Sequence, residues 1–196
     1  MNERAEMRGG SRAGEPPLVV DMDGTLLRTD TLVEAVLALV ASNPRRTPEV
    51  LAWLRHGKAG FKRRLADRLL AEPGALPLEP AVIAEIEAAR AAGRRVELVS
   101  AADARQVAAV AAHLGLFDAV AGTGEETGGH NLSGAAKAAY LEARHGPRGF
   151  DYMGDSRADL PVWTRARRAI TAGAGPGLRA AAQRANPDAA HLAPRE

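Results

Sequence analysis

The sequence contains no cysteine among its 196 residues. This absence excludes disulfide bonds, thiolate nucleophiles and zinc sites built on sulfur, and it is typical of a cytoplasmic protein. No apolar run approaches the roughly 20 residues that span a bilayer. The formal net charge is only +2, so the composition gives no indication of nucleic-acid binding. Residues 1–16 have no apolar stretch, and we expect a disordered tail there rather than a signal peptide.

The chain is long enough for one compact domain with a modest insert, and 46% of its residues are hydrophobic. From residue 80 onward, short apolar segments alternate with helical patterns. Such alternation predicts an α/β fold, in which a doubly wound parallel sheet lies between two layers of helices. The expected strands are 18–20, 96–99, 117–121, 149–153 and 169–172, and the expected helices are 79–92, 103–114, 133–145, 157–165 and 177–185.

Residues 30–78 contain no strand pattern, and three helices are expected there, at 31–42, 47–56 and 61–71. We therefore predict a small, all-helical cap that is inserted after the first strand. The α/β core then consists of residues 17–29 and 79–186. The last ten residues, 187–196, are predicted to form a disordered tail.

The stretch from Leu18 to Leu27 organises the chain. Its three apolar residues predict a short buried strand, and Asp21 and Asp23 follow directly. In open α/β sheets, the carboxyl ends of the strands form the ligand site. Two carboxylates this close repel each other, and a divalent cation with a preference for oxygen ligands, such as Mg²⁺, would offset that repulsion.

Further polar residues follow later strands or begin a later helix, so they should converge on the same crevice. Ser100 follows the second strand, Lys137 lies near the start of a helix, and Asp155 and Asp159 follow the fourth strand. Four correctly placed signals together are much stronger evidence than a single pair of aspartates.

Each of these residues has a predicted role. Asp21 is the candidate nucleophile, and Asp23 is the candidate general acid and base. The hydroxyl of Ser100, the backbone N–H groups of Ala101 and Ala102, and the charge of Lys137 suit a phosphate. The predicted phosphate-binding set is Thr25, Ser100, Ala101 and Lys137, and the predicted metal-binding set is Asp21, Asp23, Asp155 and Asp159.

The segment from Asp21 to Leu26 (DMDGTL) resembles the first motif of the haloacid dehalogenase (HAD) superfamily of phosphohydrolases. Gly154 to Asp159 (GDSRAD) resembles its metal motif, while Ser100 and Lys137 match its second and third motifs. The resemblance implies a Rossmannoid fold, Mg²⁺ bound partly by the Asp23 main-chain carbonyl, and a C1-type cap as in phosphoserine-phosphatase-like members. The chain is also similar to the HAD module found fused to UbiA-type prenyltransferases.

These observations predict a Mg²⁺-dependent phosphomonoester hydrolase that forms an aspartyl-phosphate on Asp21. The substrate would be a small or a lipid-linked phosphate. One alternative is a phosphotransferase on the same scaffold, and another is a non-catalytic regulatory module that docks through its cap. A receiver domain also phosphorylates an aspartate beside Mg²⁺, but the long helical insert after the first strand argues against it.

The cap carries a surplus of basic residues between positions 43 and 72. This surplus could attract an anionic substrate or a membrane surface, or it could belong to a solvated helix face. Glu34, the only charged residue of the first cap helix, could recognise a substrate amine or simply face water. The eight basic residues are Arg45, Arg46, Arg55, Lys58, Lys62, Arg63, Arg64 and Arg68, against Glu49, Asp67 and Glu72.

Overall fold

The structure is a computed structural model that describes residues 15–192, except for the side chains of residues 58 and 59. Six parallel strands form one sheet in the order β3-β2-β1-β4-β5-β6. The strands are β1 (Leu18–Val20), β2 (Val96–Asp103), β3 (Ala119–Thr123), β4 (Asp151–Gly154), β5 (Arg168–Thr171) and β6 (Ala190–His191). The predicted doubly wound parallel sheet is therefore confirmed.

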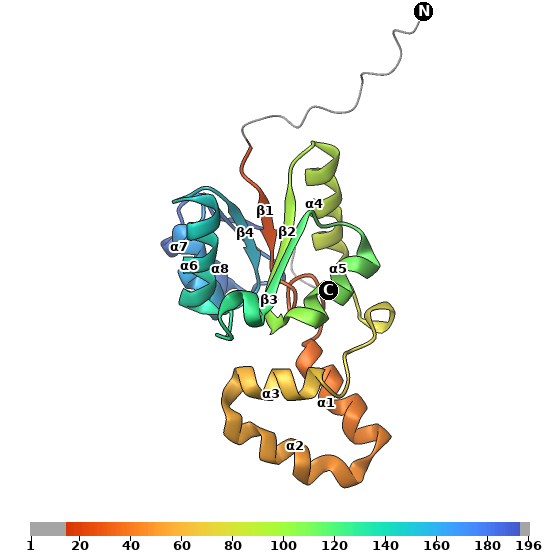
Figure 1. Ribbon diagram of the computed structural model, residues 1–196. Helices are drawn as coiled ribbons and strands as arrows, with labels where there is room; N and C mark the ends of the chain where they lie inside the picture. Colours follow the sequence, from red (N-terminus) through yellow and green to blue (C-terminus); the bar gives the residue numbers. More distant parts are fainter. Residues whose placement is uncertain (1–14, 193–196) are drawn as a thin grey trace, which may run out of the picture.

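Helices cover both faces of the sheet (Figure 1). One face carries α4 (Pro80–Ala91) and α5 (Ala104–Leu114), and the other carries α6 (Gly134–His145), α7 (Leu160–Arg165) and α8 (Pro176–Ala185). Successive residues of a strand point to opposite faces. Accordingly, Leu18 and Val20 belong to the core under α4 and α5, whereas Val19 packs into the core under α6 and α7. All three are completely buried, which explains the uninterrupted apolar run.

Strand β1 lies at the centre of the sheet. Val20 pairs with Leu98 of β2 on one side and with Met153 of β4 on the other. The chain leaves β1 toward β2 and β3, and the later strands add on the opposite side, so the strand order reverses between β1 and β4. Ligands of open α/β sheets bind at such a switch point, outside the carboxyl ends of the strands. Asp21 is the first residue beyond β1 at this point.

The cap contains α1 (Thr31–Ser42), α2 (Thr47–Trp53) and α3 (Gly57–Ala66), and Figure 1 places it beyond the carboxyl ends of the strands. The Asp30 carboxylate accepts hydrogen bonds from the backbone of Leu32 and Val33 and so caps α1. Short 3₁₀ turns at Pro44–Arg46 and Leu54–His56 join the helices. The cap has its own core, formed by Ala35, Leu39, Val50, Trp53, Phe61 and Leu65.

Several boundaries differ from the sequence prediction, including both ends of the third cap helix and the end of the second strand. Helix α3 begins at Gly57 and ends at Ala66, not at 61 and 71. Residue 71 lies outside the helix, and its backbone N–H and carbonyl form two hydrogen bonds with the Gln106 side chain. Strand β2 continues to Asp103, so Ser100 lies within the strand rather than at its end. Pairing with β3 extends β2, with a register shift between Val99 and Asp103.

The disordered tail predicted at 187–196 is wrong for residues 187–192. Ala190 and His191 form β6, which pairs with β5, and His191 Nδ1 lies 2.8 Å from the Thr171 hydroxyl. The Asn186 amide fixes the turn into β6 by donating to the Trp163 and Ala166 carbonyls, each at 3.0 Å. A strand of two residues is too short to show a period. Residues 1–14 and 193–196 of the predicted tails lie outside the described residues.

Within residues 15–192, no helix combines the length and the apolar character needed to cross a bilayer.

The amino end of the sheet, opposite the cap, is held by ion pairs. Asp151 on β4 is buried, and its carboxylate accepts two hydrogen bonds from Arg167, at 2.8 and 2.6 Å, and one from Arg94, at 2.6 Å. The Arg94 side chain is itself only 9% exposed.

Replacing Asp151 by alanine should strongly destabilise the fold, because it leaves the buried Arg94 charge without its partner. We expect a loss of about 3–5 kcal/mol in the free energy of unfolding, measured by urea denaturation. The matched control is Asp188→Ala, which breaks an exposed pair with Arg148 at 3.6 Å and should cost at most about 1 kcal/mol. Equal effects of the two substitutions would contradict this account.

Candidate active site

A cavity of about 480 Å³ lies between the cap and the carboxyl ends of the central strands. Most of the predicted site residues line it: Asp21, Asp23, Ser100, Ala101, Lys137, Asp155 and Asp159. Thr25 is the exception. It is completely buried, is absent from the described residues that line the cavity, and donates its hydroxyl to Asp155 Oδ1 at 3.2 Å. Thr25 therefore positions a carboxylate instead of contacting a ligand in the cavity.

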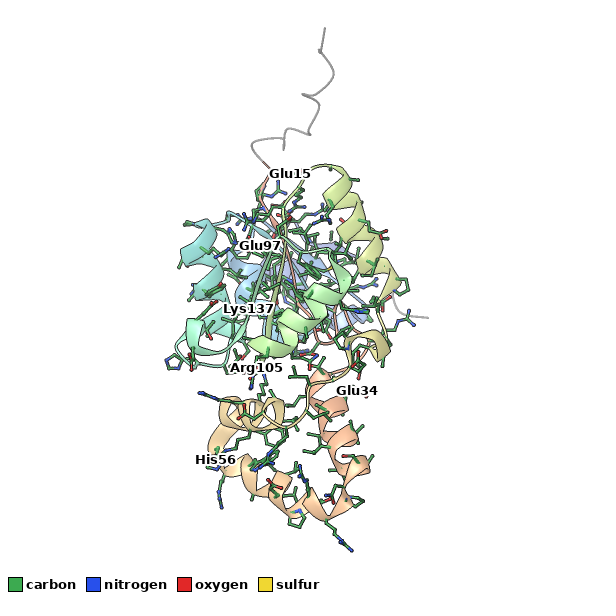
Figure 2. All side chains as sticks on the ribbon, turned by 45° about the vertical axis from the view of Figure 1, so that its right-hand side comes forward. Glu15, Glu34, His56, Glu97, Arg105 and Lys137 are labelled. Atoms are coloured by element: carbon green, nitrogen blue, oxygen red, sulfur yellow. The ribbon has the colours of Figure 1, made fainter. Side chains whose placement is uncertain are left out.

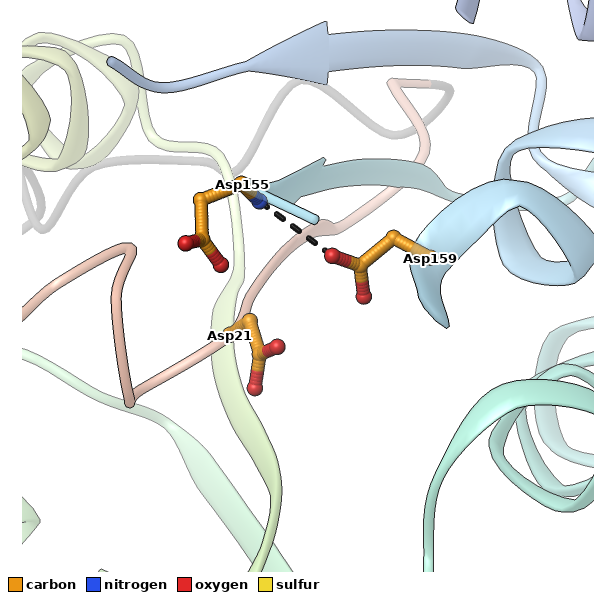
Figure 3. A group of neighbouring side chains, drawn as sticks. All are labelled: Asp21, Asp155 and Asp159. Atoms are coloured by element: carbon orange, nitrogen blue, oxygen red, sulfur yellow. Dashed lines mark hydrogen bonds between the residues drawn. The ribbon is translucent and has the colours of Figure 1, made fainter. Parts of the chain in front are cut away.

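Three carboxylates meet at the switch point of the sheet. Asp21, Asp155 and Asp159 each offer an oxygen that lies within 4.8 Å of the other two (Figure 3). Lys137 Nζ, from the first turns of α6, is 2.9 Å from Asp21 Oδ1. The sequence correctly predicted that these four residues converge. The only other acidic residue expected here, Asp23, lines the cavity but is not part of this carboxylate group.

Asp159 holds the loop after β4 in place. Its Oδ2 atom accepts hydrogen bonds from the backbone of Asp155, at 3.2 Å, and from the backbone and hydroxyl of Ser156, at 3.0 and 3.1 Å. Its Oδ1 atom accepts from the Tyr152 hydroxyl at 2.9 Å. These contacts turn the loop so that the Asp155 carboxylate faces Asp21, as Figure 3 shows.

Tyr152 is a site residue that the sequence did not predict. Its hydroxyl accepts a hydrogen bond from Lys137 Nζ at 2.8 Å and donates to Asp159, so it links the cation to the carboxylates. Burial raises the pKa of this phenol well above its usual value, so the hydroxyl keeps its proton. A tyrosine inside a buried strand needs a hydrogen-bond partner for its hydroxyl, and this requirement is the feature of the sequence from which a polar role of Tyr152 could have been predicted.

Gly24 makes room for this arrangement. Its φ angle is +77°, and a Cβ atom at this position would lie 2.2 Å from Asp155 Oδ2. Both the backbone conformation and the close approach of Asp155 therefore require glycine.

Asp23 points toward the cap. Its Oδ1 atom accepts a hydrogen bond from the backbone N–H of Thr31, the first residue of α1, at 2.8 Å. Burial raises the pKa of the Asp23 carboxyl, and the Thr31 hydrogen bond opposes that rise. A raised pKa suits a general acid. The Asp23 main-chain carbonyl, which the resemblance implies as a metal ligand, stays a prediction.

The phosphate donors expected around Ser100 are partly engaged within the protein. The Ala102 N–H donates to the Ser100 hydroxyl oxygen at 3.1 Å, so it is not a free donor as predicted. The Ala101 carbonyl accepts from Lys62 of the cap at 2.5 Å and from Thr123 at 2.8 Å. Ser100 itself lines the cavity.

Burial dominates the electrostatics of Asp21. It raises the pKa of the carboxyl to about 7, although the Lys137 ammonium lowers it, while the charge of Asp159 adds to the rise. When all three carboxylates are ionised, they and Lys137 together carry a net charge of −2. An all-oxygen donor set with this charge fits Mg²⁺. Because Asp159 already accepts four hydrogen bonds, Asp21 and Asp155 are the carboxylates that would hold the ion.

The cap is closed over the core by polar contacts at its edge. Besides Lys62, the guanidinium of Arg105 on α5 bridges Asp67 of the cap, at 2.7 Å, and Asp103 of the core, at 2.9 Å. Figure 2 shows Arg105 at this boundary. Glu34 is not among the described residues that line the cavity and accepts a hydrogen bond from Thr29 at 2.7 Å, which disfavours the amine-binding alternative.

The haloacid dehalogenase-like hydrolase family matches residues 18–163, a range that contains every residue of this site. The chain belongs to this family. The resemblance to the HAD superfamily that was predicted from its motifs is thus confirmed. A curated relative, the uncharacterized protein y4nM of Sinorhizobium fredii, is 36% identical over 159 residues, which are 81% of this chain and 30% of that protein. The chain thus spans less than a third of this relative's length.

Solved structures share the fold of this HAD-family chain at low sequence identity. A Bordetella pertussis protein of unknown function superposes with a TM-score of 0.61 and 19% identity, covering 90% of this chain and 97% of that one. A phosphoserine phosphatase, solved as an analogue of its phospho-aspartyl intermediate, gives a TM-score of 0.60 and 16% identity, covering 93% and 95%.

Titration of Asp21 should be visible in the stability of the metal-free protein. Because burial raises the pKa of Asp21 in the folded state to about 7, from 3.8 when unfolded, the folded state holds this proton more tightly. Stability attributable to Asp21 is therefore present at low pH and is lost as the pH rises from about 4 to 7. Relative to wild type, Asp21→Asn should gain stability over this range and change little above it, as measured by urea denaturation at each pH. A pH-independent difference would contradict the raised pKa.

Proposed function

We propose that this protein is a Mg²⁺-dependent phosphomonoester hydrolase that acts through an aspartyl-phosphate on Asp21. The observation that carries the proposal is the position of Asp21 at the end of the central strand. There its carboxylate contacts Lys137 at 2.9 Å and lies in the cluster with Asp155 and Asp159. The family membership supports hydrolysis, and the phospho-aspartyl analogue solved for a structurally similar phosphoserine phosphatase supports the intermediate.

In the first step, an Asp21 carboxylate oxygen bonds to phosphorus while the bond from phosphorus to the alcohol oxygen breaks. The Asp23 carboxyl gives its proton to the leaving alcohol, which the raised pKa of Asp23 favours. In the second step, water attacks phosphorus, Asp23 takes up a proton from that water, and the Asp21–phosphorus bond breaks. Phosphate leaves and both aspartates return to their starting states.

The other residues hold the phosphate and the nucleophile. Lys137 would contact a phosphate oxygen while it holds Asp21, and its hydrogen bond to Tyr152, which in turn donates to Asp159, supports this position of the Lys137 side chain. When bound by Asp21 and Asp155, Mg²⁺ would neutralise the charge of the incoming phosphate. The closed cap would exclude water during the first transfer.

Asp21→Asn should abolish turnover, because the amide is a poor nucleophile. We expect kcat for p-nitrophenyl phosphate to fall at least about 1,000-fold, with the fold intact by circular dichroism. The matched control, Asp188→Asn, changes the same group at an exposed position and should retain wild-type activity. Residual activity within tenfold of wild type would mean that another residue is the nucleophile.

Activity should also require the divalent ion. Chelation should stop hydrolysis, and added Mg²⁺ should restore it. Because Asp159 orients the loop that carries Asp155, Asp159→Asn should raise the Mg²⁺ concentration for half-maximal activity by about 10–100-fold. The measurement is a Mg²⁺ titration of wild type and variant under identical conditions. Undiminished hydrolysis in excess chelator would refute the metal requirement.

A further inference from the structure

The cap side of the cavity is lined by aliphatic side chains. They come from α1, from α3 and from the segment that follows α3: Leu32, Ala35, Leu65, Ala66, Leu69 and Leu70. The carboxyl ends of the strands supply the polar side, with the carboxylates, Lys137 and Ser100. A ligand whose phosphate lies at Asp21 therefore extends toward an apolar wall.

Polar side chains at the margins of this wall make contacts within the protein. The Arg28 guanidinium contacts the Glu79 carboxylate through two nitrogens, at 3.2 and 3.3 Å. The Gln106 amide forms two hydrogen bonds with the backbone of Ala71, at 2.7 and 3.1 Å. Both pairs are used to fix the segments that connect cap and core.

Lys62, which lines the cavity from the cap, also makes its contacts within the protein. Lys62 Nζ donates to the Ala101 carbonyl at 2.5 Å and to the Asn131 amide oxygen at 3.0 Å, so it connects α3 to the core. The Thr29 hydroxyl is likewise used by Glu34. These side chains hold the cap closed. Asp30 and Thr31 also line the cavity, but the Asp30 carboxylate caps α1 and the Thr31 N–H donates to Asp23. The other cap residues that line the cavity are leucines and alanines.

Leu70 is the clearest case. It is only partly buried and lines the cavity. It belongs neither to the buried core of the cap nor to the residues packed against that core, and it is absent from both cores of the sheet. Packing of the described residues therefore leaves part of this leucine facing the cavity, where an apolar ligand group would cover it.

We propose that the substrate is the phosphomonoester of an apolar alcohol, whose hydrocarbon part packs against the cap leucines. This assignment, which rests on the proposed hydrolase function, names the substrate class of the same site. A cavity of about 480 Å³ has the size of a small-molecule site. Alkyl, aryl and isoprenyl phosphates share the required chemistry.

Polar alcohols are disfavoured by the same wall. Hydroxyl, ammonium or carboxylate groups of a sugar or amino-acid phosphate would lose their water against leucine and alanine without gaining partners there. Each methylene of an alkyl chain, in contrast, gains from leaving water, and the gain corresponds to about a fourfold change in kcat/KM.

The test is a series of phosphomonoesters with the full chain and Mg²⁺. We expect kcat/KM to rise about fourfold per methylene from butyl to hexyl to octyl phosphate, until the chain fills the cavity. Glycerol 3-phosphate, phosphoserine and glucose 6-phosphate should fall at least tenfold below hexyl phosphate. Geranylgeranyl phosphate in phosphatidylcholine vesicles tests whether the substrate comes from a membrane or from solution. A kcat/KM above that for soluble octyl phosphate indicates a membrane lipid, and a kcat/KM below it indicates the phosphate of a soluble alcohol.

Two variants locate the effect. Leu70→Ser should flatten the dependence of kcat/KM on chain length, because it replaces part of the apolar wall. The matched control is Leu37→Ser, which makes the same change on α1 at a side chain that is 59% exposed and outside the cavity lining. It should preserve the wild-type slope. Thermal denaturation of both variants verifies that they are folded.

The outcomes separate the two proposals. If p-nitrophenyl phosphate is hydrolysed with Mg²⁺ but the alkyl series is flat, or if a polar phosphate exceeds hexyl phosphate, the apolar substrate class is overturned and the hydrolase function stands. If no phosphomonoester is hydrolysed, the proposed function itself fails.

Discussion

The structure depends on holding like charges together at one edge of the sheet. Oxygens of Asp21, Asp155 and Asp159 lie within 4.8 Å of one another, and at this distance a pair of carboxylates repels by about 3 kcal/mol at an effective dielectric constant near 20. Lys137 offsets one negative charge. Burial raises the pKa of Asp21, which favours the protonated, neutral form of that carboxyl and so reduces the repulsion. A hydrogen bond from the Asp155 backbone to Asp159 holds the loop after β4, in which the Asp155 carboxylate approaches Gly24. The close packing of these carboxylates thus determines both the geometry and the electrostatics of the site.

The two ends of the cavity serve different tasks. In the proposed function, the sheet presents carboxylates and Lys137 to the phosphate, whereas the cap presents leucines to the alcohol part of the substrate. The contacts of Lys62, Arg105 and Gln106 hold the cap against the core at three places. In the proposed function, the reacting groups therefore lie at the strand ends, and the residues that recognise the alcohol lie in the cap.

The residues that could be predicted from the sequence have local signals. Three apolar residues followed by Asp21 and Asp23 predicted β1 and the site, and Asp30 with the Asn43–Pro44 break predicted α1 to the residue. Tyr152 was missed because a strand tyrosine looks like an ordinary core residue until its hydroxyl meets Lys137. The position of Thr25 outside the cavity lining had no local signal, because its burial arises from packing of the whole core. Strand β6 is too short for a pattern, and Lys62 resembles its basic neighbours until the cap folds over the core.

The most direct test is a crystal structure with Mn²⁺, which shares the preference of Mg²⁺ for oxygen ligands and gives an anomalous signal. The account predicts one strong anomalous peak between the carboxylates of Asp21 and Asp155, about 2.1 Å from an oxygen of each, with Asp159 still hydrogen-bonded to the loop. An absence of density there at saturating Mn²⁺, or a peak bound elsewhere in the cavity, would contradict it.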